Sequence, residues 1–333
     1  MRVVLITRHG GPEVLTVEER PSPRCGAGQV RIEVAAAGVN FADTLARVGL
    51  YEDAPDPPCV VGYEVAGTVA EVGEGVTGVA IGARVMAGTQ FGGYAEEVVV
   101  PAADAIALPD GMSFEDGAAI PVNYATAWAA LLGYGSLREG ERVLIHAAAG
   151  GVGIAATQIA LRHGAEVWGT ASPGKHDALR EQGVRHPLDY TRDGWWSAVP
   201  PLDIVLDAIG GPSFRRSMGL LRPGGRLVAY GASSVSEGET KNMLKVLPKA
   251  LPMLRGFNLI TQMQESKSVI GLNMLSLWKD RGTLAPWIDP ISALIDDGTV
   301  RPVVHEAVPF DRAGDAHRIL GERRNVGKVV LVP

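Results

Sequence analysis

Three glycines close together in the sequence could bind a phosphate group. Residues 148–153 read Ala-Ala-Gly-Gly-Val-Gly, which is the G-x-G-x-x-G pattern with Ala148 in place of its first glycine. Gly150 would let the backbone approach a diphosphate, and Gly153 would let a helix pack closely on the preceding strand. The free N–H groups at the start of that helix would favour an anion. Because many glycine-rich turns only join a strand to a helix, the pattern needs its structural context.

The segments on either side of this turn supply that context. Residues 142–146 are typical of a buried strand, 154–163 of a helix and 166–170 of a second strand. A strand, a helix and a strand in this order form a βαβ unit of a parallel sheet. We therefore predict a dinucleotide site whose turn consists of Ala149, Gly150, Gly151, Val152 and Gly153.

The end of the second strand indicates which dinucleotide binds. NAD-binding proteins usually place an Asp or Glu about 20 residues beyond the turn, where it holds the ribose hydroxyls. Here the strand ends Gly-Thr-Ala-Ser at residues 169–172, and Lys175 and His176 follow. A cation beside the adenosine ribose would neutralise a 2′-phosphate, so we expect NADP(H) rather than NAD(H). The alternative is that Lys175 is only a solvated charge at a helix start.

The chain as a whole divides into two parts. Residues 1–121 are rich in Val, Gly and Pro with short strand-like runs, which indicates a compact all-β unit. Residues 122–263 alternate strands and helices. The patterns of residues 268–278 and 288–296 predict helices, and residues 329–332 a terminal strand that returns to the first domain. A cleft between two such domains is where ligands usually bind.

The composition argues against several classes of function. The 333 residues carry a formal net charge of −6 and no long basic run, which makes nucleic acid a poor candidate partner. Only Cys25 and Cys59 are present, which excludes a four-cysteine zinc site and favours a reducing, cytoplasmic location. The sequence shows neither a secretory signal nor an apolar stretch of about 18 residues that would suggest a membrane span.

Two stretches of the sequence carry a family resemblance. Residues 62–69 read Gly-Tyr-Glu-Val-Ala-Gly-Thr-Val, and residues 140–158 extend across the glycine turn. Both resemble signatures of the medium-chain dehydrogenase/reductases, specifically of the zinc-free quinone oxidoreductase group. Leu161 departs from the second signature, which normally has a small or basic residue there. Further short stretches, among them residues 40–43 and 325–329, are similar to the vesicle amine transport protein branch.

This resemblance implies the fold and the domain limits. The expected class is α/β, with a GroES-like β-barrel catalytic domain and a Rossmann nucleotide-binding domain. Residues 1–121 would form the first domain, completed by about 264–333, and residues 122–263 would form the second. Relatives of this kind commonly form homodimers, so we expect one here.

The resemblance also extends the list of cofactor residues. Lys175 and Tyr190 match residues that hold the adenosine phosphate in related reductases, and Asn325 matches one near the nicotinamide end. Ser172 and Gly231, each at the end of a predicted strand, complete the residues that we expect to bind NADPH.

The same resemblance is informative where it fails, at the metal site. Zinc-dependent relatives have a metal-binding His between the Gly and Glu of the first signature, where this chain has Tyr63. Their ligand Cys would lie near Asn40, and no cysteine occurs between Cys25 and Cys59. Without such N and S ligands, alcohol oxidation assisted by a Lewis acid loses its metal. Hydride transfer to an activated alkene or a quinone does not need one.

Two side chains are candidates for the chemistry of such a reduction, which needs a hydride, stabilisation of an enolate-like oxygen and a proton. Tyr51 is the first candidate for the proton donor, because it matches a tyrosine of related enoyl reductases, although it could equally be a packing tyrosine. Asn40 could hydrogen-bond the substrate carbonyl or the cofactor amide, or it could equally cap a turn. Leu45 stands where some quinone oxidoreductases have a second tyrosine.

We therefore predict an NADPH-dependent oxidoreductase that reduces quinones or α,β-unsaturated carbonyl compounds without zinc. The alternative is an NADPH-binding protein of membrane trafficking that binds lipid or partner proteins with little turnover. Residues 241–255 could form a basic amphipathic helix, interrupted by Pro248 and Pro252. A lid over the substrate cleft or a helix facing a second subunit explains this segment better than membrane contact.

Overall fold

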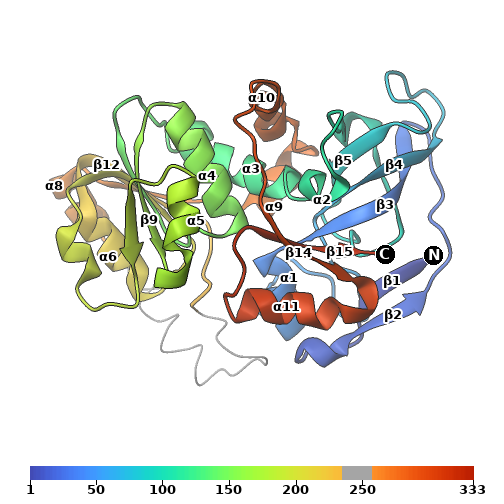
Figure 1. Cartoon of the computed structure of the whole chain (residues 1–333), viewed down its shortest axis with the longest axis horizontal. Coiled ribbons are helices and arrows are strands. Elements are labelled where there is room, and N and C mark those ends of the chain that lie inside the picture. Colours follow the sequence, from blue (N-terminus) through green and yellow to red (C-terminus); the bar gives the residue numbers. More distant parts are fainter. Residues whose placement is uncertain (235–256) are drawn as a thin grey trace.

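Two domains lie next to each other along the long axis of the molecule (Figure 1). The structure is a computed structural model that describes residues 1–234 and 257–333. The segment 241–255, for which an amphipathic helix is predicted above, lies outside the described residues. The expected α/β architecture is confirmed, because one domain is built on a parallel sheet and the other on a mainly antiparallel one.

Six parallel strands form the sheet of the second domain. They are β8 (Arg142–Ile145), β9 (Glu166–Ala171), β10 (His186–Asp189), β11 (Leu202–Asp207), β12 (Leu221–Ala229) and β13 (Ser268–Gly271). Their order in the sheet is β10-β9-β8-β11-β12-β13, which is that of a Rossmann fold. Ligands of such sheets bind outside the carboxyl ends of the strands where the order reverses, here at β8 and β11. The glycine turn follows β8 and therefore lies at this point.

Helices cover both faces of this sheet, with α4 and α5 on one face and α6 on the other (Figure 1). α4 (Gly151–Arg162) begins in the glycine turn and ends, as expected, just before Gly164. Gly164 has a φ of 74°, the left-handed conformation that commonly ends a helix. α5 covers His176–Glu181 and α6 covers Pro212–Leu220.

One predicted helix is wrong in its first part. The pattern of residues 268–278 predicts a helix, but β13 occupies the first four of them and α9 (Met274–Arg281) begins only afterwards. Val269 and Ile270 pair with residues of β12 in parallel register. These β-branched side chains suit a strand, and pairing across the sheet outweighs the local helical pattern. The parallel sheet therefore extends beyond the expected limit at residue 263.

The first domain is a mainly antiparallel β structure that the end of the chain completes. Its strands are β1 (Arg2–Ile6), β2 (Leu15–Glu19), β3 (Gln29–Val39), β4 (Glu64–Val72), β5 (Arg84–Gly88), β6 (Glu97–Pro101), β7 (Ala105–Ala107), β14 (Val304–Pro309) and β15 (Lys328–Val332). The larger sheet has the order β14-β15-β3-β4-β5-β7, with β6 also paired to β3. Because β15 pairs with β3, the chain returns to the first domain as predicted.

Several helices were not foreseen in this domain. α1 (Phe41–Val48) interrupts the all-β pattern predicted for residues 1–121, and it ends at Gly49, which has a φ of 74°. Among the described residues, α10 (Ala285–Asp296) contains the helix predicted for residues 288–296, and the other α-helices are α2 (Phe114–Gly117), α3 (Pro121–Trp128), α8 (Leu259–Glu265) and α11 (Ala313–Gly321). Short 3-10 or π segments cover Pro12–Val14, Ala102–Asp104, Ala129–Gly133, Pro173–Lys175, Trp195–Ala198 and Phe310–Arg312.

One hydrophobic core continues from the first domain into the second. It contains Ala66 and Met86 of the first sheet, Tyr124 of α3, and Ile145 and Ala155 of the Rossmann domain, all of them buried. α3 connects the two parts, because it packs on both β5 and α4. The position of the glycine turn relative to the first domain is therefore set by packed apolar surface.

The close approach of α4 to its preceding turn generates a first prediction. A Cβ on Gly153 would lie 2.4 Å from the Ala147 carbonyl oxygen and 2.7 Å from backbone atoms of Ala148. Since backbone cannot move aside as a flexible side chain can, we expect Gly153→Ala to lower the free energy of unfolding by about 1–3 kcal/mol in urea denaturation. Gly219→Ala in α6 is the matched control, because a Cβ there meets no atom within 4 Å. It should leave stability unchanged or raise it.

Candidate functional site

The glycine turn has the geometry that its sequence predicts. Gly150 is the N-cap of α4 in an extended conformation, so the first N–H groups of the helix have no partner within it. A side chain on Gly151 would collide with the amide of Asn123, since a Cβ there would lie 2.5 Å from Nδ2. Backbone atoms of the turn itself therefore leave no space for a side chain at Gly153, and Asn123 of α3 leaves none at Gly151.

The end of the chain crosses this turn on its way back to the first domain. The Gly327 N–H donates to the Ala149 carbonyl at 2.7 Å, and Gly150 and Gly327 form a parallel β-bridge. Asn325 lies just before this crossing, and its Nδ2 donates to the Gly327 carbonyl at 2.7 Å. The structure therefore brings the predicted residue Asn325 next to the predicted turn.

Lys175 joins the same crossing segment. Its Nζ donates to the carbonyl oxygens of Arg323 and Asn325 at 2.7 and 2.5 Å. Burial lowers the pKa of Lys175, and the positive charge of Arg323 adds to this effect. The ammonium keeps one N–H beyond these two hydrogen bonds. The alternative of a purely solvated charge at a helix start is therefore wrong.

The other predicted cofactor residues follow the ends of parallel strands. Ala171 and Asp189 are paired at the ends of β9 and β10, so the next residues of the chain include Ser172 and Tyr190 at one edge of the sheet. Tyr190 is exposed. Gly231 follows β12, and a Cβ on it would lie 3.0 Å from the Ala208 carbonyl after β11. Together with Val152 in α4, these residues all lie along the carboxyl edge.

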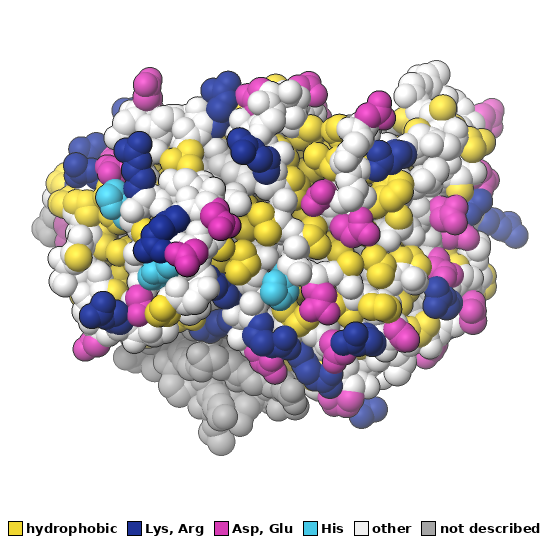
Figure 2. Space-filling model, in the orientation of Figure 1, with side chains coloured by type: hydrophobic (Ala, Val, Ile, Leu, Met, Phe, Trp, Pro, Cys, Tyr) yellow, Lys and Arg dark blue, Asp and Glu magenta, His cyan; other side chains and the backbone are white. Residues whose placement is uncertain are grey.

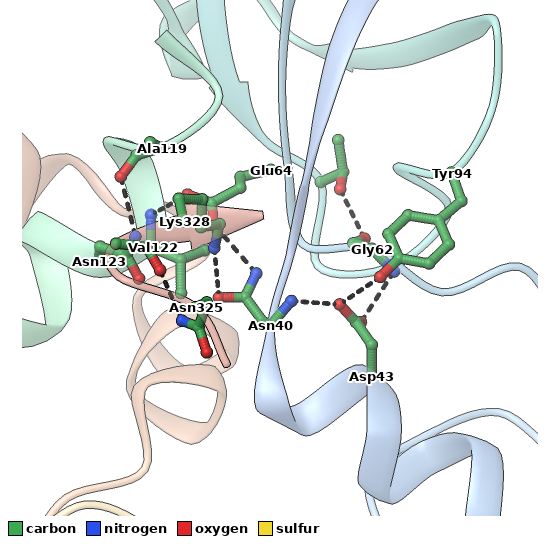
Figure 3. A network of polar contacts seen from close by, with 12 residues as sticks. Asn40, Asp43, Gly62, Glu64, Tyr94, Ala119, Val122, Asn123, Asn325 and Lys328 are labelled. Atoms are coloured by element: carbon green, nitrogen blue, oxygen red, sulfur yellow. Dashed lines mark hydrogen bonds and ion pairs between the residues drawn. The ribbon is translucent and has the colours of Figure 1, made fainter. Parts of the chain in front are cut away.

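A buried ion pair connects this edge to the first domain (Figure 3). Lys328, directly after Gly327, contacts Oε1 of Glu64 through its Nζ, and the two side chains are 3% and 0% exposed. Asn40 bridges them, accepting from Lys328 at 2.7 Å and donating from Nδ2 to Glu64 at 3.0 Å. The other carboxylate oxygen of Glu64 accepts the Val122 N–H at 2.7 Å. Strands β4 and β15 and the start of α3 thus meet at one carboxylate.

This network changes the view of Asn40. Its backbone N–H donates to the Asp43 carboxylate at 2.7 Å at the start of α1, which agrees with the predicted alternative of a capping residue. Its side-chain oxygen and one of its amide hydrogens are committed to Lys328 and Glu64. The second amide hydrogen and the second lone pair of Oδ1 remain for a ligand, and Asn40 has a structural role whatever else it does.

A second buried carboxylate, Asp43, organises the neighbouring turn (Figure 3). It accepts hydrogen bonds from Tyr94 at 2.9 Å and from the Gly62 N–H at 3.1 Å. Burial raises the pKa of Asp43 to about 6, and the hydrogen bonds from Asn40 and Tyr94 oppose this rise. Asp43 holds Gly62, and therefore the next residue, in place.

Three aromatic rings lie next to this turn. The ring of Tyr63 is 6.4 Å from that of Tyr51 at an angle of 88°, and 5.1 Å from that of Phe91. Tyr51 is partly buried in this cluster. Burial and the charge of Asp53 raise the pKa of Tyr51 to about 12, while the Tyr63 hydroxyl lowers it. Tyr51 is therefore protonated at neutral pH, as a proton donor must be.

Sequence reasoning found the turn but missed the buried polar network. Glu64 and Lys328 are single charges inside apolar strands, Val-Val-Gly-Tyr-Glu-Val-Ala and Gly-Lys-Val-Val-Leu, and this is a signal that could have found them. Asp43 carries no comparable signal, because it falls in a segment without a clear pattern. A small depression between the two features is lined by Asn123, Gly151, Gly327 and Lys328, among other residues.

Three further observations concern the surface and the described residues outside this site. On the face seen in Figure 2, acidic and basic side chains are intermixed and form no field of one sign. Within residues 1–234 and 257–333, no cluster of three or more His, Cys, Asp or Glu could hold a metal ion. No helix in this described part of the chain is long and apolar enough to cross a membrane.

A mainly antiparallel domain joined to a Rossmann sheet, with a glycine turn at their junction, is the arrangement of a dehydrogenase. Residues 26–110 match the family model of the alcohol dehydrogenase GroES-like domain, and residues 182–331 match that of the zinc-binding dehydrogenases. The chain is 37% identical to the synaptic vesicle membrane protein VAT-1 homolog of Rattus norvegicus, over all of this chain and 84% of that protein.

Solved structures agree with this relationship. Escherichia coli quinone oxidoreductase complexed with NADPH is 29% identical and superposes with a TM-score of 0.85 over the full length of both chains. CurK enoyl reductase is 26% identical with a TM-score of 0.85 over 99% of each chain. The chain therefore belongs to the medium-chain dehydrogenase/reductases, in the quinone oxidoreductase group close to VAT-1.

The ion pair at the junction generates the second prediction. Lys328→Met leaves the Glu64 carboxylate buried without its cation, so we expect a loss of about 3–5 kcal/mol in the free energy of unfolding, measured in urea. Adding Glu64→Gln removes the uncompensated charge and should recover part of this loss. Arg180→Ala, at an exposed pair with Asp177, is the control and should change little. A double variant less stable than Lys328→Met would contradict this account.

Proposed function

We propose that this protein is an NADPH-dependent reductase of quinones or α,β-unsaturated carbonyl compounds that works without zinc. One observation carries the proposal. The segment that crosses the glycine turn continues directly into Lys328, which forms an ion pair with Glu64. The residue before Glu64 is Tyr63, and its ring lies beside that of Tyr51. The nucleotide turn and a candidate proton donor are thereby joined through one short series of contacts. The relatives named quinone oxidoreductase and enoyl reductase support this reaction class.

The residues present fit a dinucleotide. The N–H groups at the start of α4 would bind its diphosphate, with Ala149, Gly150, Gly151, Val152 and Gly153 forming the turn around it. Ser172, Lys175 and Tyr190 would surround the adenosine phosphate at the ends of β9 and β10. Gly231 would leave space beside β11, and Asn325 would lie toward the nicotinamide. When bound, NADPH supplies a hydride with its electron pair.

The protein has to supply orientation and a proton. Uptake of the hydride by the acceptor leaves negative charge on its oxygen, and Tyr51 would donate a proton to that oxygen. The half-buried position of Tyr51 and its raised pKa keep this proton on the phenol until it is needed. Tyr63 and Phe91 provide an apolar wall that suits a planar acceptor and limits access of water.

A second candidate function is that of an NADPH-binding protein that acts at membranes or with partner proteins. The names of the VAT-1 relatives, which refer to a synaptic vesicle membrane protein, favour it. Flotation of the protein with anionic liposomes, with and without NADPH, would test it. Tight lipid binding together with no oxidation of NADPH by any acceptor would favour this second function. We also propose that the protein is a homodimer, which sedimentation can measure.

The third prediction concerns the cofactor. In an acceptor panel of quinones and enones, we expect oxidation of NADPH in preference to NADH. Lys175→Ala should raise KM for NADPH by about 10- to 100-fold, the effect of losing one hydrogen bond to a charged group. KM for NADH should change much less.

The comparison of the two cofactors separates binding from structure. Lys175 also holds the crossing segment through Arg323 and Asn325, and loss of that support would weaken both cofactors alike. An equal rise in KM for NADH, or a wild-type preference for NADH, would contradict the assigned role of Lys175.

The fourth prediction concerns the proton donor. Tyr51→Phe keeps the ring and removes the hydroxyl, so we expect kcat on the best acceptor to fall about 100-fold with KM for NADPH unchanged. Tyr134→Phe, at an exposed tyrosine, is the matched control. An unchanged kcat for Tyr51→Phe would remove Tyr51 as an obligate donor.

A further inference from the structure

Tyr63 has a buried hydroxyl that makes no hydrogen bond of ordinary length and angle in the described part of the chain, although it is near enough to the Tyr51 hydroxyl to lower the pKa of that group. Tyr63 as a whole is only 5% exposed. Buried hydroxyls are normally paired, because a hydroxyl removed from water without a partner destabilises the folded state. An unpaired donor of this kind needs an explanation in function or in strain. The other two such atoms, on His163 and Ser234, lie outside the aromatic cluster.

The surrounding structure fixes the backbone of Tyr63 and packs against its ring. Its carbonyl accepts the Thr89 N–H at 2.9 Å. The residue before it is fixed by the hydrogen bond from Gly62 to Asp43, and the residue after it is Glu64, fixed by Lys328. Phe91 packs on one side of the ring. The backbone of Tyr63 is thus fixed on both sides, and its ring packs between Tyr51 and Phe91.

The neighbour that this hydroxyl can serve is Tyr51. The two rings are perpendicular with centroids 6.4 Å apart. The Tyr63 hydroxyl lowers the pKa of Tyr51, against the effects of burial and of the charges on Asp53 and Asp43. Burial, together with Asp43 and Tyr51, raises the pKa of Tyr63 itself. Of the two phenols Tyr51 therefore loses its proton first, and Tyr63 remains able to donate.

We propose that Tyr63 is a positioning residue that donates a hydrogen bond to the Tyr51 oxygen while Tyr51 gives its proton to the reduced acceptor. This inference rests on the proposed function. The acceptor carbon gains the hydride with its electron pair, and its oxygen becomes an anion. The O–H bond of Tyr51 breaks and the proton passes to that anion, which leaves Tyr51 as a phenolate. Tyr63 keeps its own proton, and water returns one to Tyr51 afterwards.

The balance of charges around Tyr51 explains why such a donor is needed. Asp53 and Asp43 both disfavour a phenolate at this place. Water is limited by the aromatic packing, so a hydrogen bond supplied by the protein must stabilise the developing charge. A preorganised donor costs no rearrangement at the moment of proton transfer. This explains why a hydroxyl without a partner is retained in the resting protein.

Tyr63→Phe tests the inference, because it keeps the ring and its packing and removes only the hydroxyl. We expect kcat on the best acceptor of the panel to fall about tenfold, the effect of one neutral hydrogen bond made in the transition state. KM for the acceptor and for NADPH should stay unchanged. The solvent deuterium isotope effect on kcat should rise, because proton transfer from Tyr51 becomes slower. The variant should be at least as stable as wild type in urea, since it loses an unpaired buried hydroxyl.

The double variant Tyr51→Phe/Tyr63→Phe gives the decisive comparison. If Tyr63 acts only through Tyr51, the double variant should have the kcat of Tyr51→Phe alone. If the two substitutions lowered kcat by factors that multiply in the double variant, the inference would be overturned. A Tyr63→Phe enzyme with wild-type kcat and isotope effect would also overturn it. Either result would leave the proposed function standing. If the wild-type protein failed to oxidise NADPH with every acceptor of the panel, both the proposed function and this inference would be overturned.

Discussion

The ammonium of Lys328 and the carboxylate of Glu64 meet at the junction of the two domains, almost completely removed from water. The attraction between two buried charges offsets the cost of removing them from water only if further hydrogen bonds surround each charge. Here Asn40 and the Val122 N–H supply these hydrogen bonds. The pair therefore requires β4, β15 and the start of α3 to come together in one arrangement. Other contacts of the site follow from it, because Gly327 reaches the glycine turn one residue before Lys328.

This constraint gives the two halves of the site a common reference point. The glycine turn is fixed to the crossing segment by Gly327, and the aromatic cluster is fixed to Glu64 by the adjacent residue Tyr63. Lys175 holds the crossing segment from the nucleotide side through Asn325. A displacement of the segment would therefore disturb Lys175 and the aromatic cluster together. The apolar core through α3 resists such a displacement.

Local patterns made the Rossmann domain and its turn predictable from the sequence. Gly153 is required by backbone contacts within a few residues, and the helix around it has a clear start and stop. What could not be predicted depends on partners far apart in the chain. Glu64 finds Lys328 only through the return of β15 to β3, and β13 forms only because β12 offers an edge to pair with. Asn40 was recognised as a candidate, but the bonds that commit its side chain were not.

Position 63 holds a tyrosine where the family resemblance places a metal-binding His in zinc-dependent relatives. Where a zinc ion is present, its charge stabilises an oxygen anion directly. A tyrosine there cannot do so by charge, and its burial near Asp43 makes it a poor acid. What it can offer is a buried hydroxyl, on a residue whose chain neighbours are held by Asp43 and Lys328 and whose ring lies 6.4 Å from that of Tyr51. A rigid turn between two buried carboxylates thus suits hydrogen-bond stabilisation as well as it suits metal binding, provided that the acceptor is already activated for hydride.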